Sequence, residues 1–401
     1  METIVRGYES LDRAWQRDCS RLRQDHVNVQ AHAFHRLARM GLAIATGLAI
    51  GLLFVQLRAA WSDVQKTDFQ VFYDSGRAWL QGADLYATSA RMPNLNPPHF
   101  VVAFAALSVL PVQGALAVWL IVNVASAVLA SALIFVELRI AASTRNVQIA
   151  MTAAGLCTGV LVALETAQIT GVLMLLMTLA WSASRRGRWI ACGIIVGLIV
   201  SVKPFFGCLL LIAMHRGQYR SIAAALLTAG AALVAGAVLA GPESFGRWIQ
   251  TGQLVDWFQH PANASLLGVL ARAGEKSWMV WCMVVVAVVA VSAAGGPRRS
   301  LDVDWSVFAL VSLLISPLGW NYYLPILAGP IAAVAMLRPQ ILFASVGFLW
   351  PIPLLAVAAP LTRLSLLVAG SLQAWSLIAL WISMLTVSRH QRHVTSVPAQ
   401  C

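Results

Sequence analysis

Long apolar runs, separated by short loops that carry most of the basic residues, dominate this chain. The first run begins near Met40 and the last ends near residue 388. A helix needs about 20 consecutive apolar residues to cross a bilayer, and many of the runs approach that length. The pattern predicts an all-α polytopic membrane protein with about 12 (10–13) transmembrane helices. The expected spans are 40–57, 113–138, 147–163, 169–183, 188–202, 204–214, 220–240, 277–294, 305–319, 322–337, 340–358 and 365–388.

The run 99–110 is shorter and is interpreted as a dipping or interfacial segment. Counting it as a crossing would reverse every later loop. Without it, most arginines fall in loops on the side of the N-terminus, as the positive-inside rule requires of cytoplasmic loops. We therefore expect both termini in the cytoplasm and two long outer loops, 58–99 and 241–276.

The same reading gives the domain organisation. Residues 1–39 form a basic cytoplasmic N-terminal segment, 40–388 the transmembrane domain, and 389–401 a short cytoplasmic tail. The basic segment either lies along the inner leaflet or acts only as a positively charged topology anchor, which is the preferred interpretation.

Composition supports the membrane class. Hydrophobic residues make up 59% of the chain and charged residues 11%, whereas soluble domains carry about a quarter charged residues. The net charge of +12 could indicate a nucleic-acid partner, but the basic residues sit in short loops between apolar runs, so we expect the lipid bilayer as partner and no nucleic acid. The six cysteines show neither a disulfide framework nor a metal-ligand spacing.

The first outer loop contains a helical pattern over residues 68–80 that starts at an acidic residue, Asp68. Its apolar side chains recur at helical spacing, which predicts an amphipathic helix lying on the membrane surface. Asp68 is either the helix N-cap or a functional carboxylate held at the lipid–water boundary. The apolar positions are Phe69, Phe72, Tyr73, Gly76, Trp79 and Leu80.

Polar side chains also gather at the predicted outer ends of the spans: Glu165, Gln168, Lys203 and the triplet Asn321-Tyr322-Tyr323. Ionisable groups at membrane depth are costly, so their convergence on one side suggests a functional site. The alternatives are a lysine that snorkels to the interface and tyrosines that anchor a span. In the second outer loop, residues 253–263 could grip a sugar or form another interfacial helix.

Several strings of residues resemble glycosyltransferase family 87, whose members are bacterial membrane enzymes of the GT-C class. They use polyprenyl-phosphate sugars and are best known as α-mannosyltransferases. The strings are Asp68-Phe69, Tyr73 to Tyr86, Asn96-Pro97-Pro98, Gln168-Ile169-Thr170-Gly171, Lys203-Pro204, Asn263 with Ser265-Leu266, and Ser316-Pro317-Leu318-Gly319-Trp320.

The resemblance implies an inverting hexosyltransferase with Asp68 as general base. The donor phosphate would contact Lys203, with Arg77, His99 and Tyr322 as further candidates. The sugar or acceptor would contact Gln168, Glu165, Asn321, Tyr323, Asn263 and Asp256. The donor is a polyprenyl-phosphate sugar, mannose by default, and the acceptor is a lipid-linked or periplasmic glycan. No cofactor is required, although a divalent metal is compatible with the class. The enzyme would lie in the bacterial inner membrane with its active site facing the periplasm.

One triplet departs from the family pattern. Members commonly carry a histidine after the Ser-Pro-x-x-Trp element, where this chain has Asn321-Tyr322-Tyr323, and none of these side chains carries a positive charge at neutral pH. Two other functions therefore stay open: a polytopic lipid or sugar transporter (flippase), and a non-catalytic protein that keeps the GT-C scaffold.

Overall fold

The computed structural model describes residues 36–295, 299–349 and 362–394, with side chains described up to residue 387. Helices are the main regular secondary structure of the described residues, which contain two isolated β-bridges but no named strand. The expected N-terminal segment falls almost entirely outside these ranges, as do residues 395–401 and the last part of the expected span 340–358.

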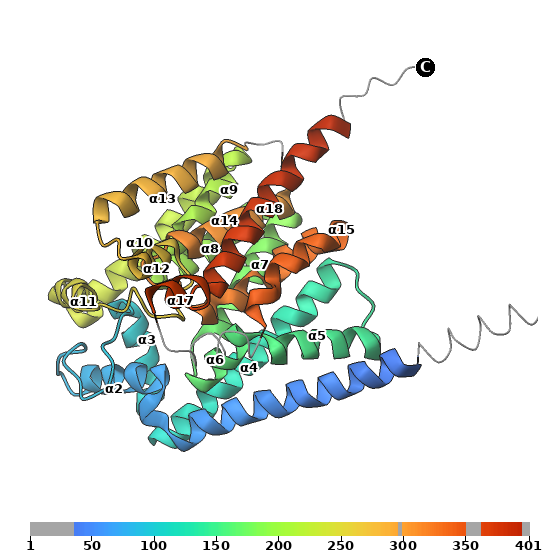
Figure 1. The fold of residues 1–401 in the computed structure, drawn as a ribbon. Coiled ribbons are helices and arrows are strands. Elements are labelled where there is room, and N and C mark those ends of the chain that lie inside the picture. Colours follow the sequence, from blue (N-terminus) through green and yellow to red (C-terminus); the bar gives the residue numbers. More distant parts are fainter. Residues whose placement is uncertain (1–35, 296–298, 350–361, 395–401) are drawn as a thin grey trace, which may run out of the picture.

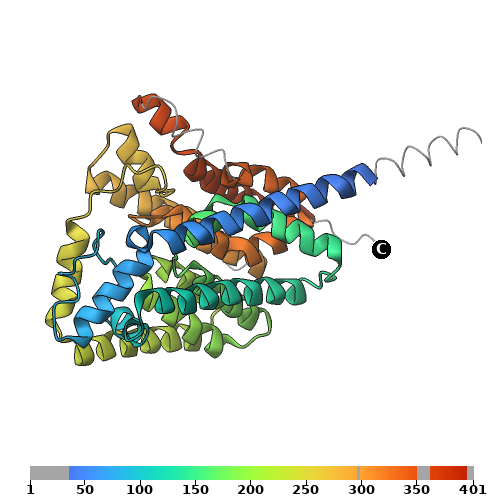
Figure 2. The same ribbon diagram turned by 90° about the horizontal axis from the view of Figure 1, so that it is seen from below.

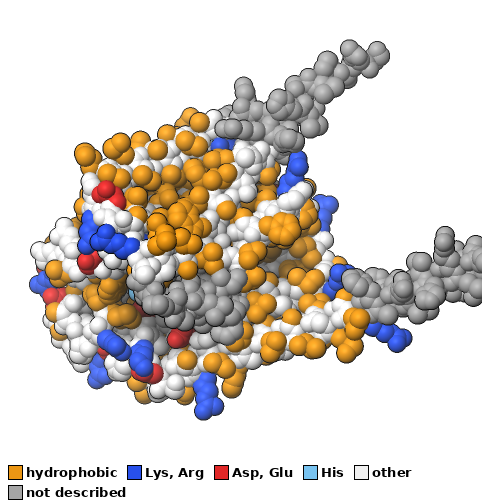
Figure 3. Space-filling model, in the orientation of Figure 1, with side chains coloured by type: hydrophobic (Ala, Val, Ile, Leu, Met, Phe, Trp, Pro, Cys, Tyr) orange, Lys and Arg blue, Asp and Glu red, His pale blue; other side chains and the backbone are white. Residues whose placement is uncertain are grey.

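Among the described helices, three are long and apolar enough to cross a membrane: Arg36–Ser62, α4 (Val112–Glu137) and α10 (Tyr219–Ala240). Their outer faces are unusually apolar, because Leu227 and Val238 of α10 are 74% and 77% exposed. Hydrophobic side chains cover much of the molecular face in Figure 3. Apolar faces of this extent are covered by lipid in membrane proteins.

The described residues do not confirm the expected count of about 12 (10–13) transmembrane helices. Apart from the three long helices, the apolar helices have 10–17 residues, and several expected spans are broken. Span 147–163 consists of α5 (Thr144–Leu156) and α6 (Thr158–Glu165), separated by Cys157 in an extended conformation. Span 204–214 begins as the 3-10 helix η2 (Pro204–Leu209) and ends as α9 (Leu210–His215), and span 322–337 begins as η4 (Asn321–Leu327) before α15 (Ala328–Leu337).

The remaining helices fill the bundle and its loop end (Figures 1 and 2). They are η1 (Val64–Lys66), α2 (Asp68–Leu80), α3 (Pro98–Ser108), α7 (Thr170–Arg185), α8 (Trp189–Val202), α11 (Glu243–Gln253), α12 (Leu266–Ala273), α13 (Trp278–Ala293), α14 (Leu301–Ile315), η5 (Pro339–Phe348), α17 (Arg363–Val368) and α18 (Leu372–Val394). Both views place α2, α3 and α11 together at one end of the bundle.

Close helix contacts depend on glycines with no room for a side chain. A Cβ on Gly193 of α8 would meet the backbone of Ser221 in α10, and one on Gly171 of α7 would meet the backbone of Asn123 in α4. Small residues let helix backbones approach in this way, which compensates for the weak hydrophobic drive between helices in lipid. These contacts set the positions of the helix ends that form the site.

The helix predicted at residues 68–80 forms as α2, but its apolar face does not rest on a membrane surface. Phe69 and Phe72 pack edge-on against Phe104 of α3, and a Cβ on Gly76 would collide with α3 at Ala105. The apolar stripe is therefore used for packing inside the protein. The N-cap is Thr67, whose hydroxyl accepts from the backbone N–H of Gln70, so Asp68 is the first helical residue and its carboxylate is free for another role.

Candidate active site

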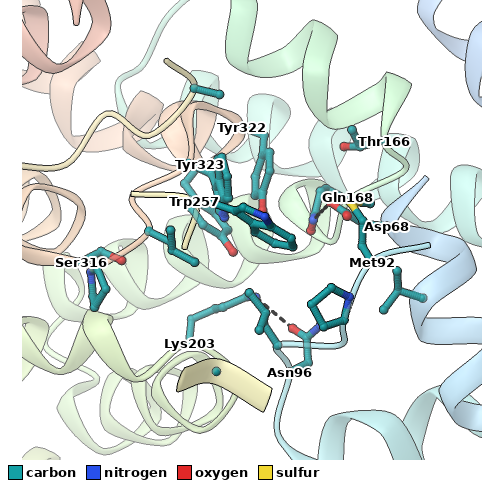
Figure 4. Close-up of a pocket in the computed structure, with 18 of the residues that line it drawn as sticks. Asp68, Met92, Asn96, Thr166, Gln168, Lys203, Trp257, Ser316, Tyr322 and Tyr323 are labelled. Atoms are coloured by element: carbon teal, nitrogen blue, oxygen red, sulfur yellow. Dashed lines mark hydrogen bonds between the residues drawn. The ribbon is translucent and has the colours of Figure 1, made fainter. Parts of the chain in front are cut away.

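A cavity of about 700 Å³ opens where the loop end of the bundle meets the broken helices. Figure 4 shows Asp68, Thr166 and Gln168 on one side, Lys203 and Asn96 on another, and aromatic rings between them. Residues from both outer loops and from three helix breaks line it. They are Lys66, Asp68, Val71, Phe72, Met92, Pro93, Leu95, Asn96, Val162, Thr166, Gln168, Val202, Lys203, Pro204, Phe205, Trp248, Ile249, Gly252, Trp257, His260, Ala262, Ser316, Pro317, Leu318, Trp320, Asn321, Tyr322 and Tyr323.

Asp68 is held in place by one hydrogen bond at its backbone and another at its side chain. Its N–H donates to the Thr166 carbonyl oxygen at 2.9 Å, and the Gln168 side-chain amide donates to its Oδ2. Burial raises the pKa of Asp68 to about 6, against the smaller lowering effects of the Gln168 hydrogen bond and the Lys203 charge. A carboxylate with a pKa near the working pH is suited to accept a proton and release it again.

Gln168 is aimed at Asp68 by a strained turn at the end of α6. Ala167 has φ +49°, a left-handed conformation that costs a non-glycine residue about 1 kcal/mol or more. The turn is held because Trp119 Nε1 donates to the Ala167 carbonyl at 2.7 Å and the Gln168 N–H donates to the Ala163 carbonyl at 2.9 Å. Strain maintained by surrounding contacts is typical of functional sites.

Lys203 provides the cationic side of the cavity. It caps the C-terminus of α8, which stops there because the next residue is Pro204. Its Nζ donates to Asn96 Oδ1 at 2.8 Å and lies 5.6 Å from the centre of the Tyr323 ring. Asn96 is itself held by Asn94, so the ammonium group is oriented by a rigid loop.

Aromatic rings form the wall between the carboxylate and the second outer loop. Trp320 and Tyr322 are nearly parallel, with ring centres 6.1 Å apart, and Trp257 is tilted against Trp320 at 6.2 Å. Tyr322 contacts Tyr323 edge-on at 4.7 Å. The triplet that departs from the family pattern thus faces the cavity with Asn321, Tyr322 and Tyr323.

The two outer loops are tied together over the cavity. Arg247 of α11 forms an ion pair with Asp84 at 2.9 Å, and Trp248 Nε1 donates to the Leu95 carbonyl at 3.0 Å. These contacts join α11 to the loop that carries Asn96.

Six of the predicted site residues meet in this cavity: Asp68, Lys203, Tyr322, Gln168, Asn321 and Tyr323. The other five lie elsewhere. Arg77, Glu165 and Asp256 point to the exterior, and His99 packs beside Gly236 of α10. Asn263 is fully buried behind the wall, because its amide bonds to the backbone of Phe258, Ser265, Pro317 and Gly319 and leaves no polar atom for a ligand.

Asn96 and Trp320 line the cavity but were not predicted as ligand contacts, although both belong to strings that resemble the family. Trp257, which lies in the segment 253–263 that was predicted either to bind a sugar or to form an interfacial helix, also lines the cavity. Within the described residues, no three His, Cys, Asp or Glu side chains gather as a metal-binding group.

The protein is thus a helical bundle with an apolar surface that brings a carboxylate, an ammonium group and aromatic rings into one cavity. The sequence profile of Glycosyltransferase family 87 matches residues 94–317, more than half of the chain. The chain therefore belongs to glycosyltransferase family 87. Asp68 lies outside the matched range.

A curated relative gives a more specific likeness. The chain is 26% identical over 312 residues to the polyprenol-phosphate-mannose-dependent alpha-(1-2)-phosphatidylinositol mannoside mannosyltransferase of Mycolicibacterium smegmatis. The match covers 68% of this chain and 70% of that protein. No solved structure matches.

Broken helices that line a cavity are also common in transporters, and breaks at Lys203 and Ser316 line this cavity. They serve here to present polar groups to one chamber. Family membership places the protein among the glycosyltransferases.

Proposed function

We propose that the protein transfers a sugar, mannose first among the candidates, from a polyprenyl phosphate to a lipid-linked or periplasmic glycan. The observation that carries this proposal is that Asp68 and Lys203 line one cavity in a family 87 chain. The name of the mycobacterial relative supports the choice of donor.

Asp68 acts as the general base in this proposal. The acceptor hydroxyl gives its proton to Asp68 Oδ1, because Oδ2 is engaged by Gln168. The hydroxyl oxygen forms a bond to the anomeric carbon while the bond from that carbon to the phosphate oxygen breaks. The electron pair leaves with the polyprenyl phosphate, and the Lys203 ammonium stabilises the growing negative charge.

A single displacement of this kind inverts the anomeric centre. A retaining route needs a second carboxylate about 5–5.5 Å away as nucleophile, by analogy with glycosidases. Asp68 is the sole carboxylate among the described residues that line the cavity, and Glu165 faces the exterior.

The test uses the purified full-length protein, radiolabelled polyprenyl-phosphate mannose and a bacterial membrane lipid extract. We expect Asp68→Asn to lose transfer by at least about 100-fold, the low end of what general-base catalysis contributes. Asp74→Asn is the matched control, since Asp74 lies on the same helix, hydrogen-bonded to Gln70 and away from the cavity. Equal rates in wild type and Asp68→Asn would refute the assignment of the base.

We further propose that the cavity faces the periplasm. Gln168 and Thr170 lie at the start of α7, whereas Arg185 ends it and Arg186 follows. Sixteen helical residues separate the two ends by about 24 Å. The basic end belongs in the cytoplasm by the positive-inside rule, which leaves the cavity on the outer side.

Cysteine labelling tests this orientation. In a cysteine-free background, Asp256→Cys should react with a membrane-impermeant maleimide in intact cells, and Arg186→Cys should react only after lysis. The reverse pattern would overturn the orientation.

A further inference from the structure

The described residues that line the cavity form two chemically different sets of side chains. Its charged groups are Asp68, Lys203 and Lys66, all contributed by the first outer loop or the break after α8. Lys66 lies at the exposed rim and pairs with Asp63 at 2.6 Å. Among the described residues that line the cavity, the second outer loop contributes no carboxylate, lysine or arginine, and desolvation and the nearby Arg272 charge lower the pKa of His260. A phosphate is therefore expected beside Lys203.

The second set of side chains presents aromatic faces to the cavity. Trp257, Trp320 and Tyr322 line it, and the His260 ring lies 5.6 Å from Trp320. Aromatic faces carry partial negative charge, so they attract the weakly positive C–H groups on the face of a sugar or cyclitol ring. A neutral imidazole beside them offers one donor and one acceptor to the ring hydroxyls.

This aromatic wall is rigid before any ligand arrives. Ala264 N–H donates to the Gly319 carbonyl at 2.8 Å, and Asn321 N–H donates to the Ala262 carbonyl at 2.9 Å. Arg272 reinforces the turn through hydrogen bonds to the His260 and Asn263 carbonyls. A preformed surface of this kind binds without a large ordering cost.

We infer that the wall formed by Trp257, Trp320, Tyr322 and His260 is the acceptor subsite, and that it takes a hydroxyl-bearing six-membered ring. The inference rests on the proposed function. A ring stacked there shares the chamber with Asp68, since Tyr322 lies close enough to Asp68 for the two to interact electrostatically (Figure 4). Lys203 and Asn96 are left to the donor phosphate. This subsite thus favours an acceptor with a sugar or cyclitol ring over a simple lipid alcohol.

The test separates acceptor binding from donor use. Transfer from radiolabelled polyprenyl-phosphate mannose to octyl α-mannoside and to octanol is measured, together with hydrolysis of the donor when no acceptor is present. In Trp257→Ala we expect the KM for octyl α-mannoside to rise about tenfold, from loss of the aromatic contact. Donor hydrolysis and transfer to octanol should change less than about twofold. The KM of Trp257→Phe for octyl α-mannoside should fall between the values of the wild type and of Trp257→Ala. Trp61→Ala, which removes an exposed tryptophan of the helix Arg36–Ser62, is the matched control.

Two results would overturn the subsite. An unchanged KM for octyl α-mannoside in both Trp257 variants would show that the wall does not hold the acceptor. A matching loss of donor hydrolysis would assign the wall to the donor. Failure of the proposed function itself looks different, because the wild-type protein would then give neither transfer nor donor hydrolysis. Trp257→Phe keeps an aromatic ring and guards against misfolding of the alanine variant.

Discussion

Replacing Gln168 by leucine should move the acidic limb of the pH–rate profile to higher pH. The Gln168 amide donates to Asp68 Oδ2 and holds the pKa of Asp68 down to about 6 against the effect of burial. A hydrogen bond to a charged group contributes about 1.5–3 kcal/mol, and one pKa unit corresponds to about 1.4 kcal/mol. The pKa of Asp68 should therefore rise by about one to two units in the variant.

The direction of the shift in the pH–rate profile follows from the protonation state of Asp68 that is catalytically active. A general base must be ionised, so kcat/KM falls as the pH drops through the pKa of the free enzyme. The wild-type limb is expected near pH 6. The Gln168→Leu limb is expected at about pH 7–8, so that at about pH 6.5 some three-quarters of wild-type carboxylates but only about a tenth of the variant's are ionised.

The assay measures kcat/KM for transfer from polyprenyl-phosphate mannose between about pH 5 and pH 9. Gln70→Leu is the matched control, because Gln70 makes a similar amide–carboxylate contact to Asp74 on the same helix at 2.8 Å. An acidic limb that stays near pH 6 in Gln168→Leu would refute the reasoning. So would an equal displacement in Gln70→Leu, because the effect would then not come from the contact with Asp68.

Two further substitutions separate binding from stability. Lys203→Met should raise the KM for the donor by about tenfold or more, through loss of a charge-assisted contact with phosphate, while Lys276→Met in the exposed outer loop leaves it unchanged. Equal donor KM values in the two lysine variants would remove Lys203 from the phosphate site. Asn263→Ala should lower the free energy of unfolding by about 2–4 kcal/mol, because four buried hydrogen bonds between two segments of the wall are lost. Thermal unfolding in detergent measures this, and an unchanged midpoint would contradict the structural role given to Asn263.

Local patterns predicted those features that depend on short stretches of chain. The apolar periodicity predicted a helix at residues 68–80, and α2 occupies this segment. Proline predicted the stop after Lys203, since a residue before proline is pushed out of the helical conformation. The break at Cys157 had no such signal, because no proline follows it; its extended backbone forms an isolated β-bridge with Leu349, a residue far away in the sequence.

Periodicity shows that a helix has an apolar face, but it does not show what covers that face. The stripe of α2 suits a membrane surface and a protein interior equally well, and the contacts with α3 decide for the interior. In the same way, Asn263 has the composition of a sugar ligand, whereas its neighbours in space use up all its hydrogen bonds.

The amino-acid sequence by itself determined the membrane class, the family resemblance and the candidate base Asp68, because hydrophobic run length and short motifs are local properties. The tertiary structure alone decided which polar groups share a chamber. Asp68 and Gln168 are 100 residues apart and Lys203 and Asn96 are 107 apart, yet each pair is joined by a hydrogen bond. Such pairs arise from the packing of whole helices, whose glycine contacts and breaks bring distant loop ends to one point.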